Sequence, residues 1–213
     1  MTEIFREIDE ELRRDNLLKL WARYGRYVIA AAALALLIAG GIVAWRNHLQ
    51  SEREAQSLTY ASAFSLVGAG KNADAAKVFG AIAQEGGGYA VLAPFEQAAV
   101  LAKEGDGKGA IAVYEGLARK AGIDPVFRDL ATLLAVMHEL PGQDPKALVA
   151  RLRPLTAPGN PWRPTALELT AIAEIDAGDK TRALAIYKQL AADPATPRNL
   201  RARAGQMAAA LAP

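Results

Sequence analysis

The longest apolar run of the chain lies near its N-terminus, where the 18 residues 28–45 carry no charge. A helix of this length extends about 27 Å at about 1.5 Å per residue, close to the roughly 30 Å of hydrocarbon in a bilayer. Trp21, Tyr24 and Tyr27 precede the run and Trp45 ends it, as in the aromatic belts of membrane spans. The pattern predicts a transmembrane helix over residues 28–45.

A cleavable signal peptide is the alternative interpretation of this run. Its charged leader is normally short, whereas a long polar and amphipathic segment precedes residue 28, and Trp45 and Arg46 follow where a small-residue cleavage site is needed. We therefore expect a retained single-pass helix. Basic residues near its two ends number five before and two after: Arg13, Arg14, Lys19, Arg23 and Arg26 against Arg46 and Arg53. By the positive-inside rule the N-terminus is cytoplasmic and the remainder lies outside, which means the inner membrane and the periplasm if the cell is Gram-negative.

Residues 1–27 show the pattern of an amphipathic cytoplasmic helix. Its apolar stripe and its favourable i,i+4 pairs are Ile4, Phe5, Ile8 and Leu12, with Asp9–Arg13, Glu10–Arg14 and Asp15–Lys19. Such a helix either rests on the membrane surface or docks onto a cytoplasmic partner. A small-residue face within the span, at Ala31, Ala35 and Ala39, permits close helix contact. Residues 46–55 are expected to form a juxtamembrane linker.

Beyond the linker the chain repeats a pattern of Ala-x-x-x-aromatic-x-x-aliphatic-Ala. Its copies are Ala75, Phe79, Ile82, Ala83; Ala110, Tyr114, Leu117, Ala118; and Ala183, Tyr187, Leu190, Ala191. The first and second copies are 35 residues apart, and the second and third are 73 apart. A degenerate copy is therefore expected midway between the second and third, at Ala147, with Arg151 at the aromatic position. A second small position keeps the same period twelve residues earlier, at Ala63, Ala98, Ala135 and Ala171. Two small positions per unit indicate two helices whose backbones approach closely.

Breaks divide each unit into two helices, at residues 68–72, 105–109, 141–145 and 178–180. No alternating strand pattern of useful length is present. We therefore expect an all-α fold, with a transmembrane helix followed by an α-solenoid of about four helical hairpins over residues 56–213. Residues 198–211 are expected to be the capping helix.

Composition removes several classes of function. The 25 basic and 23 acidic residues are interleaved and leave a net charge of +2, so nucleic acid is not an expected partner. Cysteine is absent, which excludes disulfides, thiolate metal sites and thiol nucleophiles.

The chain offers few reactive groups that could serve catalysis. Of the two histidines, His48 lies just past the predicted span and His138 in an apolar helix, and packing explains both better than metal binding or catalysis. Residues 68–72 resemble a phosphate loop, but Ser65 replaces its first glycine and Asn72 its Ser or Thr, so they are expected to form a turn. Residues 105–109 are expected to end one helix and begin the next. We expect no cofactor, no metal and no catalytic residue.

The first helices of the hairpins are more apolar than one buried face requires, which favours a binding groove. The repeat register directs seven residues toward it: Tyr60, Phe64, Phe95, Thr132, Val136, Glu139 and Glu168. Packing between repeats is the alternative role for each of them. Trp162, in the proline-rich loop 153–164, either seals the neighbouring hairpin or offers an exposed anchor.

The repeat pattern resembles that of the tetratricopeptide repeat family, whose 34-residue hairpins carry small residues at the eighth and twentieth positions and an aromatic residue at the twenty-fourth. The resemblance covers about residues 56–197, and this chain lacks the early Trp and Leu-Gly and most terminal prolines of that family. The leader IFREIDEELRRDNLLKLWARYGRYVIAAAALALLIAGG resembles the start of alphaproteobacterial members of the YfgM-like family of ancillary SecYEG translocon subunits.

That second resemblance implies a periplasmic repeat domain tethered beside the SecYEG translocon, which passes translocated proteins to a PpiD-like chaperone. The expected function is therefore that of a membrane-anchored, protein-binding scaffold. An envelope-assembly or cell-division coordinator with the same repeats is the first alternative, and an enzyme with an unfamiliar site is the second.

Overall fold

The computed structural model describes residues 2–140 and 142–212, without the side chains of residues 2–20, 28, 31 and 32. The apolar stripe and ion pairs predicted within residues 1–27 fall on these side chains and lie outside the described residues, as does Ala31 of the small-residue face.

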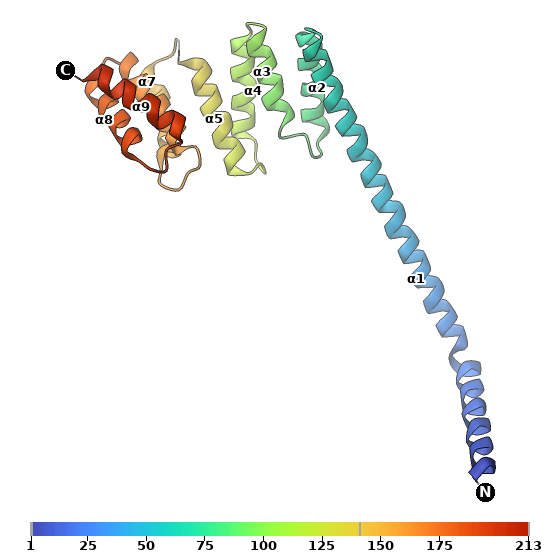
Figure 1. The fold of residues 1–213 in the computed structure, drawn as a ribbon. Coiled ribbons are helices and arrows are strands. Elements are labelled where there is room, and N and C mark those ends of the chain that lie inside the picture. The colour runs from blue at the N-terminus through green and yellow to red at the C-terminus, as the bar shows by residue number, and fades with distance from the viewer. Residues whose placement is uncertain (1, 141, 213) are drawn as a thin grey trace. The chain divides into compact units, whose positions relative to one another are not determined.

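Every regular element of the described chain is a helix, which confirms the all-α prediction (Figure 1). The elements are α1 (Thr2–Gly68), α2 (Asn72–Glu85), α3 (Ala93–Lys103), α4 (Gly107–Arg119), α5 (Pro125–Glu139), α6 (Pro145–Leu152), the short 3-10 helix η1 (Arg153–Thr156), α7 (Arg163–Asp176), α8 (Lys180–Ala192) and α9 (Arg198–Leu211). Residues 46–55, expected as a linker, are part of α1.

Among the residues whose side chains the structure describes, no helical stretch is both long enough and apolar enough to cross a membrane.

The chain divides into two compact units, Met1–Glu54 and Ala55–Pro213. In the second unit each helix packs against the next, from α2 to α9, and residues of α1 from Tyr60 to Val67 join the core that α2 and α3 form (Figure 1). The helices pair as α1 with α2, α3 with α4, α5 with α6 and α7 with α8, and α9 closes the array on α8. This order agrees with four predicted hairpins and a capping helix.

Local sequence explains where these helices begin and end. Asp106, Asp124, Asp144 and Asp179 each accept a hydrogen bond from a backbone N–H in the first turn of α4, α5, α6 and α8, which supplies the N-cap that a helix start requires. Gly70, Gly105 and Gly178 adopt positive φ in the turns between paired helices. The predicted breaks are therefore real helix boundaries.

Small residues lie where the helices of each hairpin cross. Seven of the eight alanines at the two predicted positions are fully buried: Ala63, Ala75, Ala98, Ala110, Ala135, Ala171 and Ala183. The aromatic residue four positions after the second alanine, Phe79, Tyr114 or Tyr187, is also buried. These side chains form consecutive hydrophobic clusters along the array rather than one central core.

The third hairpin departs from the predicted register by one residue. Ala147, the expected small position, is exposed, whereas Leu148 and Leu152 are buried and take the two inward positions of α6. Asp144 and Pro145 fix the start of this helix, and Pro154 follows it, so α6 is only 8 residues long. Arg151 therefore does not occupy the aromatic position.

Candidate partner-binding groove

A groove of about 410 Å³ lies along the first helices of the first three hairpins. Helices α1, α3 and α5 supply most of its lining, and α4 adds one tyrosine. The lining residues are Tyr60, Leu92, Phe95, Glu96, Ala99, Tyr114, Phe127, Leu130 and Leu134. Two of the predicted site residues, Tyr60 and Phe95, are therefore brought together in one groove.

An aromatic cluster forms the α1 end of the groove. Tyr60 stacks on Tyr89 with ring centroids 4.5 Å apart, and it meets Phe64 and Phe79 edge-on at 5.2 and 5.5 Å. Phe79 is fully buried, whereas Phe64 is 43% exposed. The cluster thus has a buried ring that holds it in place and an exposed ring that a partner can contact.

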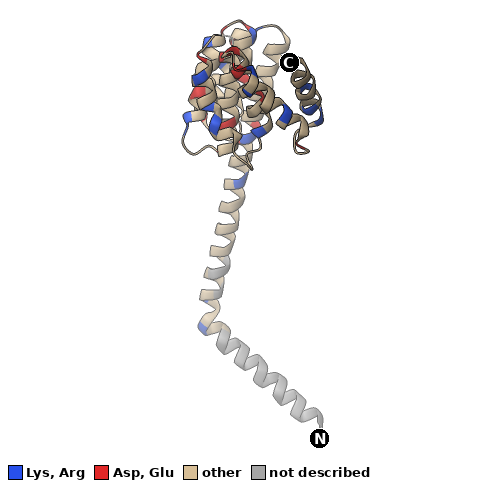
Figure 2. Cartoon of the chain, turned by 90° about the vertical axis from the view of Figure 1, so that its left-hand side faces the viewer, with Lys and Arg blue, Asp and Glu red and all other residues tan. Residues whose placement is uncertain are grey.

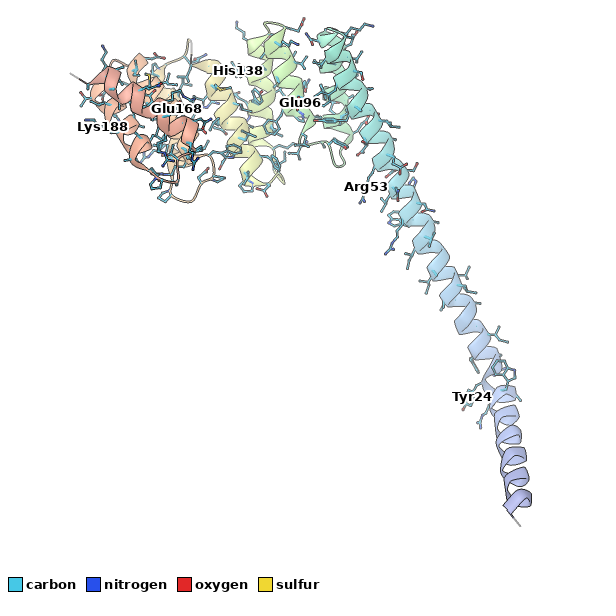
Figure 3. All side chains as sticks on the ribbon, in the orientation of Figure 1. Tyr24, Arg53, Glu96, His138, Glu168 and Lys188 are labelled. Carbon is cyan, nitrogen blue, oxygen red and sulfur yellow. The ribbon has the colours of Figure 1, made fainter. Side chains whose placement is uncertain are left out.

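The remaining wall is also aromatic. Phe95 lies 6.2 Å from Tyr114 and 6.4 Å from Phe127, centroid to centroid. His138 stacks on Tyr114 at 5.8 Å with an angle of 18° between the rings. This stacking agrees with the packing role expected for His138, and it adds a polar ring beside the groove (Figure 3).

One carboxylate, that of Glu96 on α3, lies among these rings (Figure 3). Burial raises the pKa of Tyr60 above its ordinary value, with smaller contributions from the negative charge of Glu96 and from Tyr89. Burial likewise raises the pKa of Tyr114, again with a contribution from Glu96. Glu96 therefore acts electrostatically on both tyrosines of the groove, and both stay neutral near pH 7.

Three predicted residues of α5 do not line the groove. Val136 is fully buried and Glu139 is 8% exposed, because Leu133 and Val136 pack against α6 and α7. Thr132 is half-buried and its hydroxyl donates to the carbonyl of Arg128. The predicted register placed the wrong face of α5 in the groove, and Phe127, Leu130 and Leu134 lie there instead.

Glu139 takes part in a charged cluster between the second and third hairpins. Arg151 of α6 pairs with Glu139 of α5 and, at 3.4 Å, with Glu115 of α4, which Arg119 also contacts at 3.2 Å. The cluster neutralises a buried carboxylate, so Glu139 has a structural role.

Glu168 lies on α7, away from the groove, and joins the last hairpin to the capping helix. Its two carboxylate oxygens accept from Nε and Nη2 of Arg203 at 2.5 and 2.8 Å. These hydrogen bonds and the charge of Glu168 raise the pKa of Arg203 above its ordinary value. Such a bidentate pair fixes α9 on α7 and does not present Glu168 to a partner.

The proline-rich loop before α7 is sealed against α5. The indole Nε1 of Trp162 donates to the carbonyl of Val126 at 2.9 Å, and Asn160 donates to the Asp129 carboxylate at 2.7 Å. The Trp162 ring packs, partly buried, against the cluster around Leu133. Of the two roles expected for Trp162, the structure supports the sealing role.

The glycine-rich segments are turns between helices. Gly70 takes φ 74°, and Asn72 begins α2 with its amide donating to Glu104 at 2.6 Å. Asp106 caps α4 through the N–H of Gly109. Over the described side chains, no group of three His, Asp or Glu is arranged to hold a metal ion.

Sequence reasoning missed most of the lining of the groove. Phe127, Leu130 and Leu134 follow an i, i+3, i+7 spacing on α5, which is a signal for one helix face. Leu92, which precedes α3, and Glu96 and Ala99 within α3 follow an i, i+4, i+7 spacing. Tyr114 was expected only as the aromatic residue of the repeat pattern, although it also lines the groove from α4.

Comparison with known families finds a match over much of the chain. Residues 19–148 match the family described as tetratricopeptide repeat-like domain, and this span runs from within α1, through α2 to α5, to the first residues of α6. A search of curated proteins finds no match.

Proposed function

Because this chain belongs to the tetratricopeptide repeat-like family, whose hairpin arrays are typically non-catalytic and bind proteins, we propose that it is a membrane-anchored protein-binding scaffold of the cell envelope. Its binding site is the groove along α1, α3 and α5. The observation that carries this proposal is the aromatic lining, in which Tyr60, Phe95 and Phe127 face one cavity of about 410 Å³. Cavities of this size and apolar character are typical of ligand sites, and buried aromatic rings dominate binding energy at protein interfaces.

The proposal includes an N-terminal membrane anchor. Residues 28–45 form an uncharged apolar run, and the described part of this run is a stretch of α1 without blue or red in Figure 2. Large aliphatic side chains described in this run are exposed: Leu36, Leu37 and Ile42 are 74%, 73% and 49% exposed. Contiguous apolar surface of this kind normally meets another apolar phase. The basic residues concentrated before the run favour a cytoplasmic N-terminus and a periplasmic repeat domain at the inner membrane.

The SecYEG translocon is the proposed location, and proteins emerging from it are the proposed clients. The resemblance of the leader to YfgM-like ancillary translocon subunits supports this assignment, and a PpiD-like chaperone would receive the clients. An envelope-assembly or cell-division role with the same groove is the competing assignment, and the crosslinking experiment below distinguishes the two.

Site-specific photocrosslinking in membranes tests the binding proposal. A photoreactive amino acid at Leu92, which lines the groove and is 42% exposed, is expected to form adducts with translocon or chaperone subunits. The same probe at Met137, 44% exposed and outside the groove, is the matched control. Adducts with division proteins would favour the envelope-assembly or cell-division role instead. Equal adduct yields from Leu92 and Met137 would contradict the groove as the binding site.

Protease protection tests the orientation. A protease added to the periplasmic side of spheroplasts is expected to degrade the repeat domain and to leave an anchored fragment that includes residues 1–27. A repeat domain that stays protected until the membrane is lysed would reverse the orientation and remove the translocation role.

A further inference from the structure

Glu96 differs from four other shielded carboxylates among the described residues. Glu139, Glu174 and Glu168 each have a low exposure and each is paired, with Arg151, Arg182 and Arg203 respectively. Asp193 is paired with Arg163 in the same way, at 3.1 Å. Glu96 is only half-exposed, yet no described side chain forms an ion pair with it.

The surroundings of Glu96 define what could pair with it. It is the one charged residue among the nine described residues that line the groove, and four of the others are the rings of Tyr60, Phe95, Tyr114 and Phe127. The electron-rich faces of such rings attract cations. A carboxylate among aromatic rings is therefore complementary to a positively charged group carried on an apolar segment.

We propose that the groove binds a partner segment that presents a lysine or arginine between apolar residues, with the cation on the Glu96 carboxylate and the apolar residues against the aromatic wall. This inference rests on the proposed function, because it names the chemistry of the partner at the same groove. A purely apolar segment is disfavoured because it would bury the charge of Glu96 without a compensating cation. An uncompensated buried charge is strongly unfavourable. An acidic segment would add repulsion between like charges.

Peptide binding to the full-length chain in detergent micelles tests this inference. The probes are three fluorescein-labelled twelve-residue peptides of leucine and serine. One has a central arginine, one a central citrulline, which has the same shape without the charge, and one a central glutamate. Fluorescence anisotropy is expected to show at least tenfold tighter binding of the arginine peptide. Glu96→Gln should abolish the preference, and Glu96→Lys should reverse it toward a peptide with a central glutamate.

Glu85→Gln is the matched control, because Glu85 is an exposed glutamate at the end of α2 and outside the groove. This variant should keep the full preference for the arginine peptide. Helical circular dichroism of each variant establishes that it is folded, and the Glu96→Lys reversal supplies a second readout if Glu96→Gln lowers stability.

Two further outcomes separate failure of this inference from failure of the proposed function. If the arginine and citrulline peptides bind equally and Leu92→Ser weakens the binding of both, the groove is a binding site but its preference for a cation is refuted. If neither peptide binds, or if Leu92→Ser changes nothing while photoadducts from Leu92 are also absent in membranes, the groove itself is rejected and the inference falls with it.

Discussion

Phe64 and Phe79 belong to the same aromatic cluster, with ring centroids 5.3 Å apart, but one is 43% exposed and the other fully buried. Phe79→Ala is expected to lower the free energy of unfolding by about 3 to 5 kcal/mol, because it opens a cavity in the core of the first hairpin. Phe64→Ala should cost far less stability and should instead reduce partner crosslinking. Thermal unfolding followed by circular dichroism, together with crosslinking in membranes, measures both effects.

The same pair of measurements applied to Phe95→Ala tests the centre of the groove. A collapse of the unfolding midpoint for both Phe64→Ala and Phe95→Ala would make these rings core residues. Normal stability combined with normal crosslinking would equally contradict the groove.

Glu139 and Arg151 offer a second test at single residues. The Glu139 side chain is 7% exposed and that of Arg151 34%, so Arg151→Leu leaves a carboxylate buried without its cation. We expect a loss of about 3 kcal/mol of stability, at the lower end of values for broken buried pairs because Arg151 is partly solvated. Replacing both residues by leucine should recover most of it, since no uncompensated charge remains.

Arg119→Leu serves as the control in that series. Arg119 contacts Glu115 at 3.2 Å, but its side chain is 71% exposed, so this pair should contribute only about 0 to 1 kcal/mol. Urea unfolding of these three variants and of the unaltered protein gives the comparison. Equal losses for Arg119→Leu and Arg151→Leu would show that the burial of Glu139 is unimportant.

The groove residues that sequence could supply are those of the regular repeats. Tyr60 and Phe95 occupy equivalent positions in two hairpins with intact small and aromatic positions, so extending the pattern found both. Val136 and Glu139 were misplaced because the third hairpin has no aromatic marker, and the face of α5 that is buried depends on its contacts with α6 and α7. Glu96 gave no signal of its own, because a single acidic residue on a helix is usually solvated.

At the level of single helices, two of the three glycines of α4 have opposite expected responses to alanine. Gly116 is exposed, and an added Cβ would meet nothing within 4 Å, so Gly116→Ala should stabilise the protein by about 0.5 to 1 kcal/mol. A Cβ at Gly109 would collide with the Asp106 carboxylate that caps this helix. Losing that cap costs about 1 kcal/mol, so Gly109→Ala should bring no gain or a net loss.

Chemical denaturation of the two glycine variants decides the point. A clear gain from Gly109→Ala would show that the Asp106 cap contributes nothing to the stability of α4. No change from Gly116→Ala would indicate that another interaction, invisible in local geometry, opposes the helix preference of alanine.

Helix boundaries were the most predictable feature at this scale. Glycine, proline or aspartate marks most starts and stops, and these residues act through backbone conformation and capping, which depend on few neighbours. The register of α6 was not predictable in the same way. Ala147 and Leu148 are both compatible with a helix, and only the space left by α5 and α7 decides that Leu148 faces inward.

For the whole molecule, the separation of the chain into units Met1–Glu54 and Ala55–Pro213 leads to a prediction about truncation. A fragment from Ser51 onward is expected to be soluble and helical and to unfold cooperatively, because each hairpin packs only on its neighbours and α9 covers the last one. The same fragment should no longer sediment with membranes. Circular dichroism, a thermal melt and fractionation together check this.

Loss of helical signal or of a cooperative transition in that fragment would mean that residues before Ser51 are needed for the fold of the repeats. Persistent membrane association would show instead that the repeat domain contains its own membrane contact. Either result would remove the proposed division between anchor and binding domain.

The seal made by Trp162 has a spectroscopic consequence. Of the three tryptophans in the chain, at positions 21, 45 and 162, only Trp162 belongs to the repeat domain, and its indole is hydrogen-bonded to Val126 at the junction of α5 and α7. Intrinsic emission of the Ser51 fragment therefore comes from one place, where the third and fourth hairpins meet. A red shift of that emission at lower denaturant concentrations than the loss of ellipticity would reveal that the array opens first at this junction.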